Sequence, residues 1–164
     1  GKDVIAVGKI FDIFDGEGVT EKIKTTGNTN GIAFTKALQT RDFEGLAFVN
    51  LVDFDMLYGH RRDVAGYAAA ATEFDKFVAD FIPGMREGDI LMVTADHGCD
   101  PSYTKTTDHT REYVPYLIYG KGIKPGVDLG THLCFGTIAQ TICEYLGVDA
   151  SSLDGKSVWN EIKA

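Results

Sequence analysis

The stretch ILMVTADHG, Ile90 to Gly98, decides the fold class of this chain. It begins with a mainly apolar run, Ile90–Thr94, and then changes abruptly to an aspartate, a histidine and a glycine. A short apolar run that ends in this way is typical of a buried strand in a parallel sheet. In such sheets the chemistry collects beyond the carboxyl ends of the strands. We therefore predict a strand over Ile90–Thr94 that presents Asp96 and His97 at its end.

Three more runs of the same kind extend this pattern along the chain. They are Val4–Val7, Leu46–Val52 and Pro115–Tyr119. Helical patterns lie between the runs, and this alternation predicts an α/β fold with a mostly parallel sheet.

The clearest predicted helix follows Asp63, where apolar residues recur every three or four positions until Pro83 and Gly84 end the pattern. A second helix is predicted over Phe135–Leu146, with Gly147 as its C-terminal cap. A weaker helix is expected over residues 32–38. The Gly-rich and Thr-rich segment before it, residues 14–30, reads as a long loop.

Length and composition limit the classes of protein to which the chain can belong. With 164 residues, 44% of them hydrophobic, it suits one compact domain or a piece of a larger one. The net charge of −8 argues against nucleic-acid or anionic-membrane partners, which are bound through clustered Lys and Arg. Three cysteines without CxxC spacing predict neither a disulfide framework nor a thiolate zinc site. With no apolar run near the ~20 residues of a membrane span and no basic leader, we expect a cytoplasmic location.

Residues of the types that bind metals follow two of the predicted strands. Asp53, Asp55 and His60 lie at or just past the end of the run Leu46–Val52, and Asp96 and His97 follow Ile90–Thr94. If the chain stays extended there, Asp96 and His97 point to opposite sides, which favours two ions over one. A set of carboxylates and imidazoles suits Mn²⁺, Zn²⁺ or Fe²⁺ better than calcium or a structural zinc ion.

A third imidazole, His109, comes from the loop that follows Asp96-His97. Asp53 has a second interpretation, since its carboxylate could hydrogen-bond backbone or Arg61 instead of a metal. Asp100 and Asp108 could orient the imidazoles or cap turns. The pair Arg61-Arg62 could simply be a solvated helix start.

Three segments resemble the phosphopentomutase family of the alkaline phosphatase superfamily. They are NLVDFDMLYGHRRDVAGYAAA (50–70), TADHGCDP (94–101) and TDHTREYVP (107–115). The resemblance extends to GKDVIAVGKIFDIFDGEGVT (1–20) and so covers nearly the whole chain. It implies a three-layer α/β core with helices on both faces of a mostly parallel sheet, of which this chain would be the C-terminal part.

The resemblance also implies a ligand set for two Mn²⁺ ions, with other divalent cations as alternatives. One ion would be held by Asp55, His60 and His109, and the other by Asp96 and His97. Lys9, Arg61 and Arg111 are our candidates for binding the phosphate of the substrate.

The reaction implied by the resemblance interconverts (deoxy)ribose 1-phosphate and (deoxy)ribose 5-phosphate, a step of nucleoside salvage. In the family it proceeds through a phosphothreonine enzyme and a sugar bisphosphate, which also acts as activator. Family members are more than twice as long, and their N-terminal part supplies the nucleophilic Thr, a further metal-binding Asp and a cap domain. We therefore expect no catalytic nucleophile in this chain, no mutase activity from the chain alone, and apolar faces that favour self-association.

Two alternatives remain at this stage. One is a related phosphohydrolase or phosphoglycerate-type mutase of the same superfamily, with a similar ligand set and a different nucleophile or cap. The other is a non-catalytic metal-binding module. The motifs GHRRD (59–63) and TDHTRE (107–112) favour phosphopentomutase over the first alternative. Tight Mn²⁺ binding and phosphatase or mutase activity of the purified chain would distinguish it from the second.

Overall fold

A computed structural model describes all residues, 1–164. The chain divides into two compact units. The first comprises Gly1–Met85 and Val93–Leu117, and the second comprises Arg86–Met92 and Ile118–Ala164. No helix combines the length and the apolar composition that a bilayer span requires.

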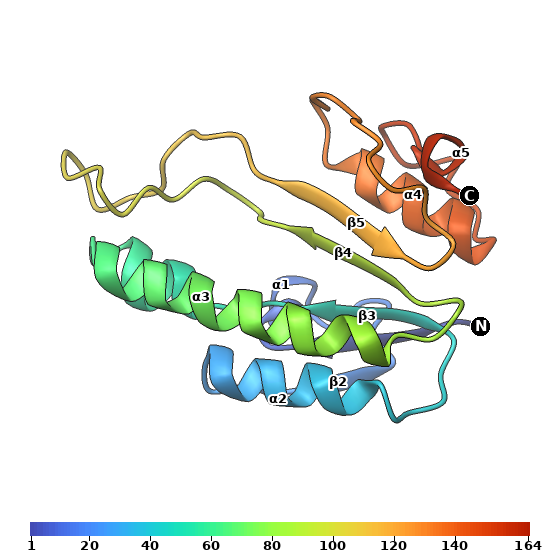
Figure 1. Ribbon diagram of the computed structural model, residues 1–164, viewed down its shortest axis with the longest axis horizontal. Helices are drawn as coiled ribbons and strands as arrows, with labels where there is room; N and C mark the ends of the chain where they lie inside the picture. The colour runs from blue at the N-terminus through green and yellow to red at the C-terminus, as the bar shows by residue number, and fades with distance from the viewer. The chain divides into compact units, whose positions relative to one another are not determined.

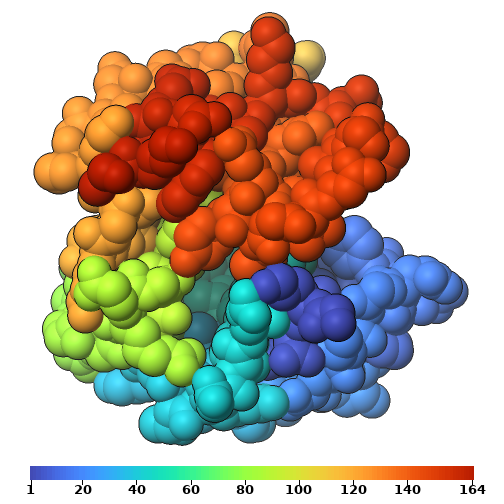
Figure 2. Space-filling model, turned by 90° about the vertical axis from the view of Figure 1, so that its right-hand side faces the viewer, coloured from blue at the N-terminus to red at the C-terminus, as the bar shows by residue number.

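The first unit is built on a three-stranded parallel sheet in the order β2-β1-β3. The central strand β1 (Asp3–Val7) pairs with β2 (Glu21–Ile23) on one side and with β3 (Gly45–Val49) on the other. The N-terminal residues lie against the segment that leads into β3 (Figure 2), where Asp3 N donates to Glu44 O over 2.9 Å. The strand predicted from Val4 is confirmed, whereas β2 lies in the segment predicted to be a loop.

Buried apolar side chains of the sheet form the core of this unit. Ile5, Val7 and Leu38 are almost fully buried, and partly buried apolar residues surround them. Leu38 is the last residue of α2 (Asn28–Leu38), so the C-terminal end of this helix packs on the sheet. That end corresponds to the helix predicted over residues 32–38. The helix begins four residues earlier than predicted.

Two helices lie beside each other next to the sheet, α2 and α3 (Val64–Phe81), as Figure 1 shows. The predicted limits of α3 are confirmed at both ends. The Asp63 carboxylate accepts a hydrogen bond from Gly66 N over 2.9 Å, which caps the first turn. A short 3₁₀ turn, η2 (Ile82–Gly84), ends the helix at Pro83. A further short helix, α1 (Ile10–Ile13), was not predicted.

The segment after β3 is helical and not extended. Residues Phe54–Gly59 form a π-helix, η1, and Asp53 before it already has helical backbone angles. The predicted strand over Leu46–Val52 therefore ends three residues early, at Val49. Periodicity alone could not detect this change, because a π-helix of one turn leaves no apolar repeat to recognise.

The predicted strands over Ile90–Thr94 and Pro115–Tyr119 exist but do not join the first sheet. They are β4 (Ile90–Thr94) and β5 (Tyr116–Gly120), and they form a separate two-stranded sheet. Figure 1 draws their arrows in opposite directions. None of the β4 residues is fully buried, so the expectation of a buried strand in one parallel sheet is wrong for this pair.

The second unit contains α4 (Gly136–Leu146) and the short helix α5 (Trp159–Ile162). Gly147 ends α4 in the left-handed conformation with φ 65°, which confirms its predicted role as C-terminal cap. The fully buried Thr141 hydroxyl accepts from Val158 N over 3.1 Å and so ties the segment before α5 to α4. The chain is thus an α/β protein with a parallel sheet and helices, as predicted.

Candidate metal centre

The π-helix η1 brings Asp55 and His60 together. His60 N donates to Asp55 O over 3.0 Å, the five-residue hydrogen bond that defines this helix type. The side chains follow the backbone, and His60 Nε2 lies 3.3 Å from Asp55 Oδ1. A motif of the form Asp-x₄-His therefore places a carboxylate and an imidazole side by side through local backbone geometry alone.

His109 reaches the same carboxylate from a distant part of the chain. Its Nε2 lies 3.4 Å from Asp55 Oδ1, and its ring centroid is 4.8 Å from that of His60. The loop that carries His109 is tied to the segment after β4 by a bridge in which Thr110 N donates to Gly98 O over 3.1 Å. One carboxylate oxygen thus faces two imidazole nitrogens.

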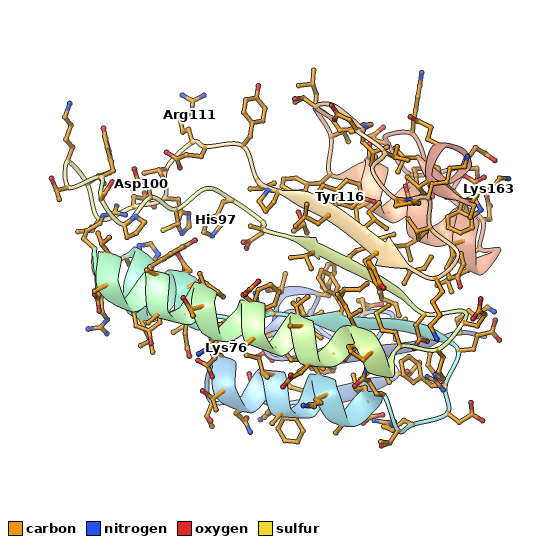
Figure 3. The ribbon with its side chains drawn as sticks, viewed as in Figure 1. Lys76, His97, Asp100, Arg111, Tyr116 and Lys163 are labelled. Carbon is orange, nitrogen blue, oxygen red and sulfur yellow. The ribbon has the colours of Figure 1, made fainter.

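His97 lies against this group as well. Its ring stacks on that of His109, with centroids 3.6 Å apart and an interplanar angle of 19°. One donor atom from each of Asp55, His97 and His109 lies within 4.8 Å of the others, a spacing that could hold a metal ion. Figure 3 shows His97 on the segment that leaves β4. Asp96 is largely exposed, and its Oδ1 lies 3.6 Å from His97 Nε2.

The five candidate ligands are therefore neighbours within one unit of the structure. Their division into two sets, one for each of two ions, stays a prediction.

Backbone carbonyls determine which nitrogen of two imidazoles is free. His60 Nδ1 lies 2.6 Å from Thr107 O, and His97 Nδ1 lies 3.2 Å from Gly98 O. A carbonyl oxygen can only accept, so each Nδ1 carries the hydrogen and each neutral ring keeps its lone pair on Nε2. At His60 this lone pair faces the oxygen of Asp55, an arrangement that is repulsive unless a proton or a cation lies between the two atoms. The donor set and its tautomers fit a divalent cation.

Cys99 and Tyr67 border the same group and show that it is partly shielded from water. Cys99 Sγ lies 3.9 Å from Asp55 Oδ1. Burial raises the pKa of the Cys99 thiol, and the Asp55 charge raises it further. Burial also raises the pKa of Tyr67, with smaller contributions from Cys99 and Asp55. The raised pKa favours the neutral thiol of Cys99, and Cys99 is not among the three residues whose ligand atoms converge.

A cavity of ≈ 190 Å³ opens beside the candidate metal centre. Ten residues line it: Tyr67, Ala95, His97, Gly98, Cys99, Asp100, Glu112, Tyr113, Val114 and Pro115. Because His97 belongs to both the cavity and the histidine cluster, a small ligand in the cavity would lie next to the candidate metal ligands.

Arg62 is a residue whose role the sequence did not reveal. We expected it to start a helix, yet its guanidinium donates to backbone carbonyls of the loop that carries His109. The sequence offers only the basic pair before Asp63, which does not distinguish a loop clamp from a solvated helix start.

Asp53 and Asp100 lie outside the cluster. The Asp53 carboxylate accepts from Asn28 N over 2.7 Å, and Asp53 N donates to Asn28 Oδ1 over 2.9 Å. Asp53 therefore caps α2. This is the second interpretation of Asp53 given above, in which its carboxylate hydrogen-bonds backbone instead of a metal. Hydrogen bonds from the Ser102 hydroxyl and backbone N–H lower the pKa of Asp100, which closes an Asx-type turn.

The three predicted phosphate-binding residues make few contacts. Lys9 is exposed and precedes α1. Arg61 donates from Nε to Met56 O over 3.4 Å. Arg111 is exposed, and Figure 3 shows its side chain pointing away from the ribbon. None of the three forms an ion pair with a carboxylate, so their positive charges are free for an anion.

Comparison with known proteins places the chain among metal-dependent enzymes. Residues 4–150 match the family model of the metalloenzyme superfamily. The chain is 52% identical over 162 residues to the phosphopentomutase of Acetivibrio thermocellus, covering 99% of this chain and 41% of that protein. It is 54% identical over 161 residues to the phosphopentomutase of Lachnoclostridium phytofermentans, covering 98% of this chain and 41% of that protein. It thus spans about two fifths of the length of these relatives.

The fold has a counterpart among solved structures. A phosphoglycerate mutase of Leishmania mexicana superposes with a TM-score of 0.72 at 18% identity, covering 96% of this chain and 37% of that chain. At this identity the likeness concerns the fold alone, and it confirms the predicted alkaline phosphatase-like core. The family is shown by the match over residues 4–150, and the chain therefore belongs to the metalloenzyme superfamily.

Proposed function

We propose that this chain is the C-terminal, metal-binding part of a phosphopentomutase that interconverts (deoxy)ribose 1-phosphate and (deoxy)ribose 5-phosphate. The similarity to proteins of that name over 98–99% of the chain supports the proposal. The observation that carries it is Asp55, whose Oδ1 faces His60 Nε2 at 3.3 Å and His109 Nε2 at 3.4 Å. This contact suits a divalent cation between the atoms.

In this proposal Asp55, His60 and His109 hold one Mn²⁺ ion, while Asp96 and His97 contribute to the other. Two such ions, when bound, offset the charge of the transferring phosphoryl group and align the attacking and leaving oxygens. The carboxylates of Asp55 and Asp96 supply negative charge to the cations. Thr107 O and Gly98 O hold the imidazoles of His60 and His97 with Nε2 free.

In this proposal, basic residues of this chain and residues outside the present sequence bind the sugar phosphate. Lys9, Arg61 and Arg111 are the candidates in this chain for holding the phosphate that does not react. The nucleophilic Thr that becomes phosphorylated is proposed to lie outside the present sequence. A sugar bisphosphate would prime it and act as activator. We place the reaction in nucleoside salvage in the cytoplasm.

The test replaces the proposed ligands one at a time in the full-length enzyme that carries this chain. We expect His60→Ala, Asp96→Ala and His97→Ala each to lower turnover at saturating Mn²⁺ by at least about a hundredfold. The physical reason is that each change removes a carboxylate or an imidazole from the proposed metal ligands, and the bound metal would stabilise the charge of the transferring phosphoryl group. Conversion of ribose 1-phosphate to ribose 5-phosphate is the assay, and circular dichroism checks that the variants are folded.

The matched control is His132→Ala, which removes an exposed histidine that belongs to none of the metal motifs. This variant should keep its turnover. A proposed ligand whose Ala variant turns over normally is removed from the set. Release of inorganic phosphate from pentose phosphates, without isomerisation, would indicate the related phosphohydrolase instead.

A further inference from the structure

The guanidinium of Arg62 is fully engaged by backbone carbonyls. Nε and Nη2 donate to Thr106 O over 2.9 and 2.5 Å, and Nη2 also donates to Asp108 O over 2.5 Å. Nη1 donates to Gly59 O and to Asp100 O, each over 3.1 Å. An arginine side chain has five N–H donors in a rigid fork, and all five are used here.

The backbone of Arg62 shows that this position is imposed by its surroundings. Its φ is 57°, in the left-handed region, which a non-glycine residue with a long side chain rarely adopts. Such strain persists only where neighbouring contacts over-determine the conformation. The hydrogen bonds of the guanidinium and the bond from Arg62 N to Gly59 O, 3.1 Å, are those contacts.

Three of the carbonyls that Arg62 binds stand one residue before a group of the metal centre. Gly59 precedes His60, and Asp108 precedes His109. Thr106 precedes Thr107, whose carbonyl accepts from His60 Nδ1. The Arg62 side chain therefore joins the two segments that must meet for His60 and His109 to face Asp55.

The positive charge of Arg62 does not explain its role, which depends on the shape of the guanidinium group. Arg62 forms no ion pair with a carboxylate. The five hydrogen bonds of its guanidinium go to carbonyl oxygens, and the Cys99 thiol is a further neighbour of its charge. A positive charge close to a cation site disfavours the cation, so Arg62 does not serve by attracting metal. A lysine would supply the same charge without the planar fork that spans four carbonyls.

We propose that Arg62 is a positioning residue, which sets the distance of His60 and His109 from Asp55 by clamping the loop Asp100–Asp108 to the end of η1. The inference deepens the proposed function and rests on it where turnover is concerned. A substitution that removes the planar guanidinium of Arg62 but keeps its positive charge should therefore loosen the loop and weaken metal binding.

The experiment compares Arg62→Lys and Arg62→Ala with the parent in the full-length enzyme. We expect Mn²⁺ affinity, measured by calorimetric titration of the metal-free protein, to fall about 10- to 100-fold in Arg62→Lys. The metal concentration for half-maximal turnover should rise by the same factor, while most of the turnover returns at saturating Mn²⁺. The matched control is Arg41→Lys, because Arg41 also uses its fork, on Glu21, in a contact that involves none of the loop carbonyls.

A second readout does not depend on activity. In metal-free, histidine-labelled protein, ¹⁵N NMR should show the Nδ1–H tautomer of His60 in the parent and a mixture of tautomers in Arg62→Lys. Unchanged Mn²⁺ affinity together with an unchanged His60 tautomer would overturn the proposal. If the parent binds Mn²⁺ but does not isomerise pentose phosphates, the proposed function fails, while the affinity loss in Arg62→Lys still decides the positioning role. Should Arg62→Ala not fold, Arg62→Lys carries the test.

Discussion

At the scale of single residues, two aspartates two positions apart have separate tasks. Asp55 Oδ1 contacts His60 and His109, whereas Asp53 caps α2 through Asn28. Gly27 is the residue before α2 and has no side chain with which to cap it, so the carboxylate comes from Asp53. A Cβ at Gly27 would stand 2.9 Å from Asp53 Oδ2, which explains why a glycine suits that position.

The cap role of Asp53 leads to a prediction. Asp53→Ala should lower the free energy of unfolding by about 1 kcal/mol, because it removes a cap and a negative charge at a helix N-terminus. Mn²⁺ affinity should stay unchanged, as measured by calorimetric titration. Asp53→Asn is the matched variant, since an amide oxygen can still accept from Asn28 N and should preserve most of the stability. A large loss of Mn²⁺ affinity in Asp53→Ala would return Asp53 to the ligand set.

At the scale of secondary structure, η1 is the element that makes the candidate centre. The helix packs closely against the segment after β4, because Gly59 is buried and lies beside Cys99. A Cβ at Gly59 would stand 2.4 Å from Cys99 Sγ and 2.9 Å from Phe54 O. His60 directly follows η1, and His109 lies on the loop that continues the segment after β4. The close approach of η1 to that segment therefore allows the two histidines to meet.

We therefore expect Gly59→Ala to be destabilising. Overpacking against Cys99 should lower the free energy of unfolding by about 1–3 kcal/mol. Adding Cys99→Ala removes Sγ and should restore part of that loss, with the contact to Phe54 O remaining. Urea unfolding of the two single variants and the double variant gives the coupling energy.

The control for this pair is Gly122→Ala, because a Cβ there would meet nothing within 4 Å. Its effect should stay within about 0.5 kcal/mol. Additive effects of Gly59→Ala and Cys99→Ala would contradict the proposed contact.

At the scale of the whole molecule, the chain spans about two fifths of the length of the phosphopentomutases that it matches. Several large apolar side chains are exposed, among them Leu133 at 92% and Leu117 at 63%. Exposed apolar surface of this kind favours association with other chains. That the chain self-associates when it is alone stays a prediction.

We predict that the 164-residue chain by itself does not isomerise ribose 1-phosphate. Phosphoryl transfer depends on a positioned nucleophile, and we place that residue outside this sequence. The assay supplies Mn²⁺ and a sugar bisphosphate primer, first with the chain alone and then with the separately made N-terminal portion of a relative. Turnover by the chain alone would contradict the placement of the nucleophile. Turnover only after mixing would support a site shared between the two portions.

The amino-acid sequence by itself determined those features that depend on neighbouring residues. The limits of α3 follow from the Asp63 cap and Pro83, and the end of α4 follows from Gly147. The strand over Ile90–Thr94 follows from its apolar run. The candidate ligands Asp55, His60, Asp96, His97 and His109 could be named from residue types and from family resemblance, because ligand chemistry is carried by side-chain identity.

Only the tertiary structure decided how distant segments combine. Strand pairing placed β1 and β3 in one sheet and β4 and β5 in another, although all four have similar apolar runs. The Asp53 cap joins residues 25 positions apart, and the Arg62 clamp joins residues up to 46 positions apart. Such contacts depend on which backbone groups the folded chain leaves unpaired at one place, and no local pattern of residues encodes that information.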